Sequence, residues 1–135
     1  MKKQHHFSSS TVWKEAATHF KAAQPRLRSV GVLMPIAGLS QTPIRIEGAK
    51  LILGRDRSLA ARILDESISR RHARVTRHID EYILDDLDSV NGTFVDGVPI
   101  VSCLLHEGDT VQLGQTIYYF ERVLEPEDAG RGDAR

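Results

Sequence analysis

The sequence has little that could cross-link, anchor or export a protein. It has 135 residues and a single cysteine, Cys103, so no internal disulfide can form, and its few cysteines and histidines do not make a structural zinc site. No apolar run reaches the roughly 18 residues of a membrane-spanning helix, and residues 1–10 lack the apolar stretch of a secretory signal. These absences predict a cytoplasmic protein that folds without a metal, a cofactor or a covalent cross-link.

The charge has no excess of either sign. The 18 Lys and Arg residues are balanced by 18 Asp and Glu residues, which argues against a general nucleic-acid binder. The distribution is uneven, because residues 1–28 carry six basic residues and one acidic residue, whereas residues 125–135 carry two and four. We therefore predict a basic N-terminal tail over residues 1–28, a folded domain over residues 29–124, and a disordered acidic C-terminal tail over residues 125–135.

A short amphipathic pattern lies in the N-terminal tail. It indicates a helix over residues 11–24, ending before Pro25. About fourteen residues is marginal for an isolated helix in water, so we expect this segment to dock on a partner or to be only nascent. Its apolar face is too small for a membrane anchor. The apolar positions recur at spacings of three and four: Val12, Trp13, Ala16, Phe20 and Ala23.

Residues 29–124 have the pattern of a β protein. Short apolar or alternating runs are separated by turn residues at roughly regular spacing, and no βαβ pattern is present. Asp96-Gly97 and Gly114-Gln115 are hairpin-type pairs, since glycine takes a positive φ without steric cost. The segment is therefore predicted to be an all-β sandwich. Its runs cover residues 30–36, 43–46, 50–53, 62–64, 72–77, 82–86, 94–95, 110–113 and 116–123.

Three polar clusters lie in the predicted loops, at residues 54–55, 69–72 and 88–93. Loops at one end of a sandwich converge, so their side chains can reach one ligand. Arginine offers planar, bidentate geometry to phosphate, and charge-assisted hydrogen bonds are roughly twice as strong as neutral ones. The clusters therefore indicate recognition of an oxyanion rather than turnover. The side chains concerned are Arg55, Ser69, Arg70 and Asn91.

In order and spacing, these clusters resemble the signature of forkhead-associated (FHA) domains. The matching residues are Gly54-Arg55, then Ser69-x-x-His72, then Asn91-Gly92-Thr93. The similarity extends through residues 85–97 and 107–114 and covers nearly all of residues 29–124. It implies an all-β, eleven-stranded β-sandwich of two sheets, with the FHA/SMAD-like fold, that binds phosphothreonine peptides through loops at one end.

The resemblance implies a role for each matching residue. Arg55 is similar to the arginine that pairs with the phosphate, and Ser69 to the serine whose hydroxyl donates to it. Arg70 stands where a further phosphate contact is common, and Asn91 resembles the asparagine that binds the peptide backbone. Val90 departs from the pattern, because Thr or Ser is frequent there and only the backbone N–H of Val90 could reach the ligand.

Four other residues are expected to support the site. His72 is similar to the histidine that braces the binding loops from beneath. Gly54 and Gly92 resemble glycines that permit tight turns, and Thr93 completes the motif around them.

These residues favour a binding module without enzymatic activity. The expected partner is a phosphothreonine-containing protein that is a substrate of a Ser/Thr kinase or is itself such a kinase, with no nucleic-acid or membrane partner. The alternative is an FHA-fold scaffold or oligomerisation element with weak or phosphate-independent binding, which the absence of a hydroxyl at Val90 motivates.

Two further hypotheses stay open at this point. The chain's own tail could occupy the site if Thr11 or Thr18 were phosphorylated. Ser69, His72 and Asp85 or Asp86 could form a hydrolase triad, although the G-x-S-x-G element and its strand-to-helix context are missing.

Overall fold

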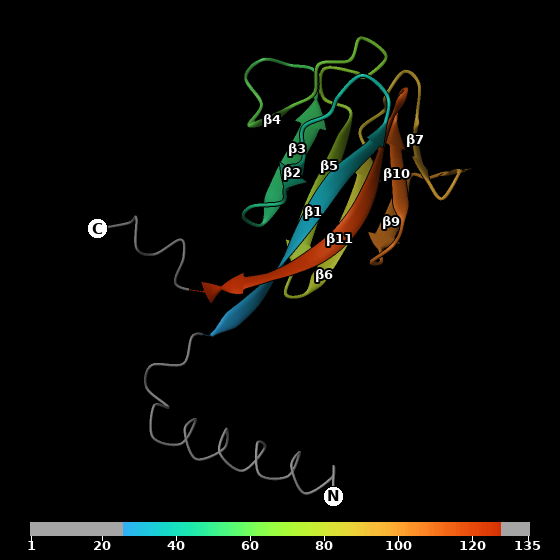
Figure 1. The fold of residues 1–135 in the computed structure, drawn as a ribbon. Helices are drawn as coiled ribbons and strands as arrows, with labels where there is room; N and C mark the ends of the chain where they lie inside the picture. Colours follow the sequence, from blue (N-terminus) through green and yellow to red (C-terminus); the bar gives the residue numbers. More distant parts are fainter. Residues whose placement is uncertain (1–25, 128–135) are drawn as a thin grey trace, which may run out of the picture. The chain divides into compact units, whose positions relative to one another are not determined.

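The computed structural model of the protein describes residues 26–127, which form eleven β-strands in two sheets (Figure 1). The two-sheet, all-β fold predicted from the sequence is confirmed. One sheet has the order β2 (Ile44–Arg45), β1 (Leu27–Ala37), β11 (Thr116–Pro126), β10 (Thr110–Leu113), β7 (Thr93–Val95) and β8 (Val98–Pro99). The other has the order β4 (Ala61–Arg62), β3 (Lys50–Gly54), β5 (Ala73–His78), β6 (Glu81–Asp86) and β9 (Ser102–Leu105).

The chain divides into two compact units, one of which is Ser29–Leu124. The other unit contains Arg28 and Glu125, which form an ion pair: the Nη2 atom of Arg28 lies 2.7 Å from the Oε1 atom of Glu125. Strand β11 runs to Pro126, so the first residues of the segment expected to be a disordered tail are strand residues. The predicted helix over residues 11–24 and the last eight residues of that tail lie outside the described residues. Within residues 26–127 there is no helix long and apolar enough to cross a bilayer.

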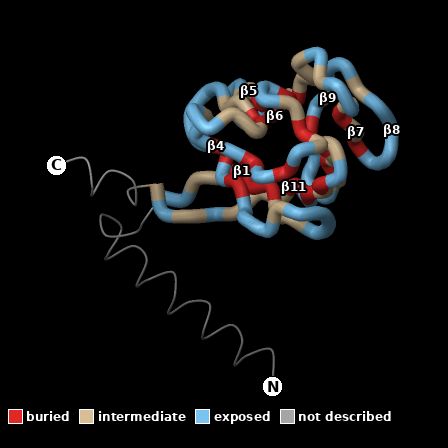
Figure 2. The backbone as a smooth tube through the Cα atoms, turned by 90° about the horizontal axis from the view of Figure 1, so that it is seen from above, coloured by how far each residue is buried: buried red, intermediate tan, exposed pale blue. Residues whose placement is uncertain are grey.

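The core lies between the two sheets. The buried residues of β5 and β6 alternate along each strand, with Ala73 and Val75 inside and Arg74 facing outward. Tyr82 of β6 packs edge-on against Phe120 of β11 with ring centroids 5.3 Å apart, so the two sheets meet through these rings. Figure 2 shows the buried positions gathered where β1 and β11 lie against β5 and β6, with the exposed loops outside.

The two hairpins predicted from glycine-containing pairs are present. Asp96 and Gly97 have φ values of 50° and 81° and connect β7 to β8, and Gly114 has a φ of 56° in the turn between β10 and β11. Two strands were absent from the sequence prediction. Strand β8 is only two residues long and contains Pro99. Strand β9 alternates in burial, but its sequence Ser-Cys-Leu-Leu ends in two consecutive apolar residues, so neither sequence shows the alternation of a half-buried strand.

Candidate functional site

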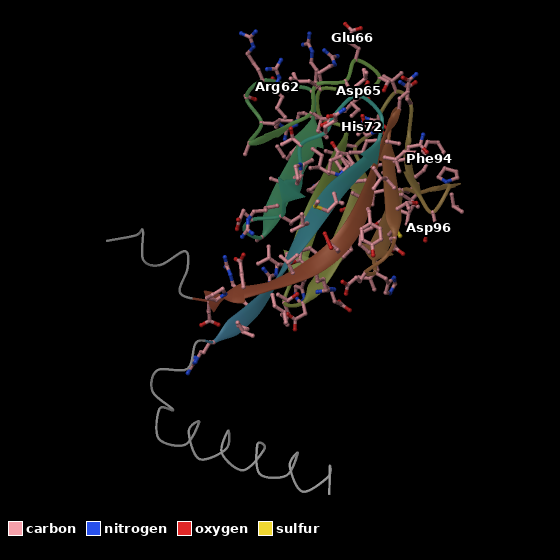
Figure 3. All side chains as sticks on the ribbon, viewed as in Figure 1. Arg62, Asp65, Glu66, His72, Phe94 and Asp96 are labelled. Carbon is pink, nitrogen blue, oxygen red and sulfur yellow. The ribbon has the colours of Figure 1, made fainter. Side chains whose placement is uncertain are left out.

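The strand register brings the three polar clusters to one end of a sheet. Strands β3, β5 and β6 are adjacent and antiparallel, with Leu53 opposite Ala73 and Ala73 opposite Asp86. The end of β3, the start of β5 and the end of β6 therefore lie at the same end of the sheet. Figure 3 shows Arg62, Asp65 and His72 near this end of the sandwich. The register thus places the loops that follow β3, precede β5 and follow β6 side by side, as the sequence clusters predicted.

His72 lies beneath these loops and joins two of them. It is fully buried. The backbone N–H of Ser69 donates to its Nδ1 at 3.0 Å, so the ring proton must sit on Nε2, which lies 2.9 Å from the carbonyl oxygen of Gly92. A neutral imidazole therefore spans from the loop before β5 to the loop after β6. This is the geometry expected of a brace.

Gly54 is required for a close backbone approach rather than for a left-handed turn. A Cβ placed there would lie 1.9 Å from the carbonyl oxygen of Arg70 and 3.0 Å from that of Ser69. In this space the N–H of Arg55 donates to the Ser69 carbonyl at 3.1 Å, and the N–H of Asp56 donates to the Arg70 carbonyl at 3.1 Å. Gly92, by contrast, has a φ of 87°, which glycine adopts without strain.

Asp86 organises the loop after β6. Its carboxylate accepts hydrogen bonds from the hydroxyl of Ser89 at 2.5 Å, the N–H of Ser89 at 3.2 Å and the hydroxyl of buried Thr93 at 2.7 Å. Ser89 in turn accepts the N–H of Gly92 at 2.9 Å. The loop that carries Val90 and Asn91 is therefore folded around one carboxylate.

Asp65 organises the loop before β5, and the sequence reasoning missed it. Its side chain is buried and accepts a hydrogen bond from the hydroxyl of Thr116 at 2.6 Å. It also accepts hydrogen bonds from the hydroxyl and the N–H of Ser67. The Ser67 hydroxyl also accepts the N–H of Gln115 at 2.8 Å, which ties this loop to the β10–β11 turn. The Asp-x-Ser spacing is typical of an Asx-turn and could have signalled this anchor.

These two carboxylates make the site sensitive to acid. Burial raises the pKa of Asp86, but the hydrogen bonds from Ser89 and Thr93 outweigh it and leave the pKa below the ordinary value of 3.8. A depressed pKa in the folded state stabilises the protein above the unfolded value, and this stability is lost as the pH falls through the folded pKa. The pKa of Asp65 is lowered in the same way by Thr116 and Ser67, against burial.

We therefore expect the melting temperature to be flat near neutral pH and to fall below about pH 4. Asp86→Asn should lower the melting temperature at pH 7 and reduce its fall between pH 5 and pH 2.5, because the variant has no carboxylate to protonate. Melting curves followed by circular dichroism across this range measure both effects. Asp80→Asn, at an exposed turn, is the matched control. Identical pH profiles for Asp86→Asn and wild type would contradict the assignment.

The structure brings together Arg55, Ser69 and Val90. Arg55 is half-buried and its Nε donates to the carbonyl of Ile68 at 3.0 Å, which directs the side chain along the loop before β5. The hydroxyl of Ser69 accepts the N–H of Val90 at 3.0 Å. A hydroxyl has one proton and two lone pairs, so Ser69 keeps its proton available to an anion. The N–H of Val90, expected to reach the ligand itself, is instead engaged with Ser69.

Asn91 lies beside these residues, and one of its amide hydrogens is used in a hydrogen bond within the protein. Its Nδ2 donates to the carbonyl of Ser67 at 2.7 Å, so the side chain joins the loop after β6 to the loop before β5. One amide hydrogen and the Oδ1 are left for a ligand. Arg70 is exposed, and its side chain lines a cavity together with Arg55.

Two arginines of the site were not predicted. Arg57 and Arg62 line the same cavity as Arg55, and the Nε of Arg62 donates to the Arg55 carbonyl at 3.2 Å. The position of Arg62 beside Arg55 depends on a strand pairing that the sequence does not show. The short strand β4 runs parallel to β3, with Arg62 opposite Gly54.

The geometry does not support a hydrolase triad. Both ring nitrogens of His72 are engaged with backbone groups, so neither faces the Ser69 hydroxyl. Asp85 pairs with Arg74 at 3.2 Å, and Asp86 is occupied by Ser89 and Thr93. Within residues 26–127 no group of three or more His, Cys, Asp or Glu side chains could hold a metal ion.

Comparison with known proteins decides the family. The family model of the FHA domain matches residues 51–114, a range that contains Arg55, Ser69 and Asn91. The chain carries an FHA domain. In structure, it superposes with a TM-score of 0.64 and 28% identity on a chain from an analysis of phosphothreonine-dependent FHA domain interactions, covering 68% of this chain and 95% of that one. With the FhaA FHA domain complexed with an intracellular domain of another protein, the TM-score is 0.63 at 28% identity, over 67% of this chain and 99% of that one.

Relatives in sequence include proteins of Corynebacterium and Mycolicibacterium. The oxoglutarate dehydrogenase inhibitor of Corynebacterium jeikeium is 35% identical over 75 residues, which is 50% of this chain and 52% of that protein. The glycogen accumulation regulator GarA of Mycolicibacterium smegmatis is 36% identical over 66 residues, 49% of this chain and 42% of GarA. The chain thus spans about half or less of the length of these relatives.

Proposed function

We propose that this FHA domain, over residues 29–124, binds phosphothreonine peptides and recruits phosphorylated partners in Ser/Thr kinase signalling. The observation that carries the proposal is the meeting of Arg55, Ser69 and Arg70 at one loop end, with the Ser69 hydroxyl proton unused by the described residues. A phosphate at neutral pH carries about −1.5 to −2 charges and three acceptor oxygens. Guanidinium groups and a hydroxyl donor are complementary to it.

The residues divide the task between holding the phosphate and holding the peptide. Arg55 and Arg70 pair with the phosphate, and Ser69 donates its hydroxyl proton to a phosphate oxygen. Asn91 uses its remaining amide hydrogen and its Oδ1 for the peptide backbone. No bond is made or broken in this scheme, and the protein acts by recognition. Support comes from relatives whose names describe an inhibitor and a regulator.

Fluorescence-polarisation titration tests the proposal. A phosphothreonine peptide library should bind more tightly than matched phosphoserine and unphosphorylated peptides. Arg55→Ala and Ser69→Ala should each lower the affinity by about ten-fold or more, because a hydrogen bond to a charged group contributes about 1.5–3 kcal/mol. Lys50→Ala, which removes an exposed positive charge at the other end of β3, should bind as wild type does.

Two outcomes would point elsewhere. Binding of a partner that is unaffected by phosphate and by Arg55→Ala would favour the scaffold alternative, which the exposed, hydroxyl-free Val90 motivates. Occupation of the site by the protein's own tail, through phosphorylated Thr11 or Thr18, concerns residues outside those described. That idea predicts weaker peptide binding by the phosphorylated chain than by a chain lacking residues 1–25.

A further inference from the structure

The cavity at the loop end is lined almost entirely by arginine. It has a volume of approximately 280 Å³, and its lining residues come from the loop after β3, from β4 and from the loop before β5. Its lining residues are Arg55, Asp56, Arg57, Arg62 and Arg70.

The charge of this lining exceeds that of one phosphate. Four guanidinium groups face a single carboxylate, that of Asp56. The carboxylate of Asp56 accepts hydrogen bonds from the N–H and the hydroxyl of Ser58, which lower the pKa of Asp56. Asp56 is therefore ionised at neutral pH, and its oxygens are already hydrogen-bonded to Ser58. Within residues 26–127 none of the four arginines has a carboxylate in ion-pair range. The net charge of about +3 is larger than the −1.5 to −2 of one phosphothreonine.

The excess positive charge lies on one side of the proposed phosphate position. In its sheet, β3 stands between β4 and β5, and β6 lies beyond β5. Arg62 belongs to β4, Arg55 follows β3, and Ser69 precedes β5. Asn91 follows β6. Arg62 is therefore on the side of Arg55 that faces away from Asn91, and its hydrogen bond to the Arg55 carbonyl holds it there.

We propose that the domain reads a second anionic group of the peptide, a phosphate or a carboxylate, which Arg57 and Arg62 bind on the β4 side of the phosphothreonine. This inference rests on the proposed function and refines it, because it names the class of peptide that the site prefers. Arg62 belongs to β4, and Arg57 lies in the loop that joins β3 to β4. Because both arginines are therefore on the β4 side of Arg55, the second anion must stand on one side of the phosphothreonine in the peptide sequence.

The test compares peptides that carry one phosphothreonine with peptides that carry a second anion. The second group is phosphothreonine, phosphoserine or glutamate, placed in turn at each of several positions before and after the first, with glutamine as the neutral match. Titrations are done in about 0.15 M salt, where exposed charges beyond roughly 8 Å are largely screened. The measured quantity is the affinity gain from the second anion. We expect about a ten-fold gain, on one side only.

Variants of the full chain assign the gain to the cavity. In Arg57→Ala with Arg62→Ala the gain should fall to less than about two-fold. Arg71→Ala is the control, because it removes an exposed arginine from the loop before β5, next to Arg70, that does not line the cavity. It should retain most of the gain. The glutamate and phosphate series show whether a carboxylate suffices.

The inference is overturned by a wild-type protein that gains nothing from a second anion at any position. It is also overturned by a gain that survives in the double variant, or that falls equally in Arg71→Ala, which would indicate a diffuse field. Failure of the proposed function has a different signature, namely no phosphate-dependent binding by any peptide, whether it carries one anion or two.

Discussion

Gly54→Ala is expected to destabilise the protein by about 3 kcal/mol or more, which corresponds to a fall of roughly 12 °C or more in melting temperature. The added methyl group would overlap the carbonyl oxygen of Arg70, a backbone atom that no rotamer change can move away. Relief requires the segment at Ser69 and Arg70 to retreat, which breaks the hydrogen bonds from the N–H groups of Arg55 and Asp56. Phosphopeptide affinity should fall with stability.

The matched control for this substitution is Gly48→Ala. Gly48 has a φ of 73° and nothing within 4 Å of the added Cβ, so this variant has only the backbone cost of a left-handed alanine, of order 1 kcal/mol. Chemical denaturation of both variants separates the overlap from this backbone cost. A Gly54→Ala protein as stable as Gly48→Ala would show that the loop moves freely and that the close approach is not needed.

His72→Ala is expected to lose about 3 kcal/mol of stability and most of its phosphopeptide affinity. The substitution leaves the N–H of Ser69 and the carbonyl of Gly92 without their partner, and each unsatisfied buried group costs about 1–3 kcal/mol. The void left by the imidazole adds to this cost. Because the ring touches both loops from within, the binding surface should lose its geometry although no ligand contact is removed.

His78→Ala provides the comparison, since His78 is exposed at the end of β5. It should melt and bind as wild type does. Hydrogen exchange at the Ser69 amide is a second measurement, and protection there should fall sharply in His72→Ala. Wild-type melting and wild-type exchange in this variant would refute the role of His72 as a brace.

The strands with strong alternation could be predicted because each carries its own signal. Ala73 and Val75 face inward while Arg74 faces outward, and this period of two is visible in the sequence alone. Two short strands could not be predicted in the same way. Strands β8 and β9 pair at sheet edges, and their sequences, Val-Pro and Ser-Cys-Leu-Leu, lack the period that reveals a strand.

The motif residues of the candidate site were also predictable, but not all of their contacts. His72 as a brace and Thr93 as a support lie where the resemblance placed them. The conformation of Gly54 was expected to be a tight turn, whereas the structure shows a close approach of two backbones. The N–H of Val90 was expected at the ligand and is bonded to Ser69.

By itself the sequence determined that this chain folds as an all-β sandwich and that arginine, serine and asparagine residues occur in the loops at its end. These properties follow from local period, turn chemistry and motif spacing, which act over a few residues. Only the tertiary structure decided that Asp65 anchors one loop through Thr116, fifty-one residues away, and that Arg62 joins Arg55 in one cavity. Such contacts depend on strand order and register, which arise from packing the whole core and leave no local mark in the sequence.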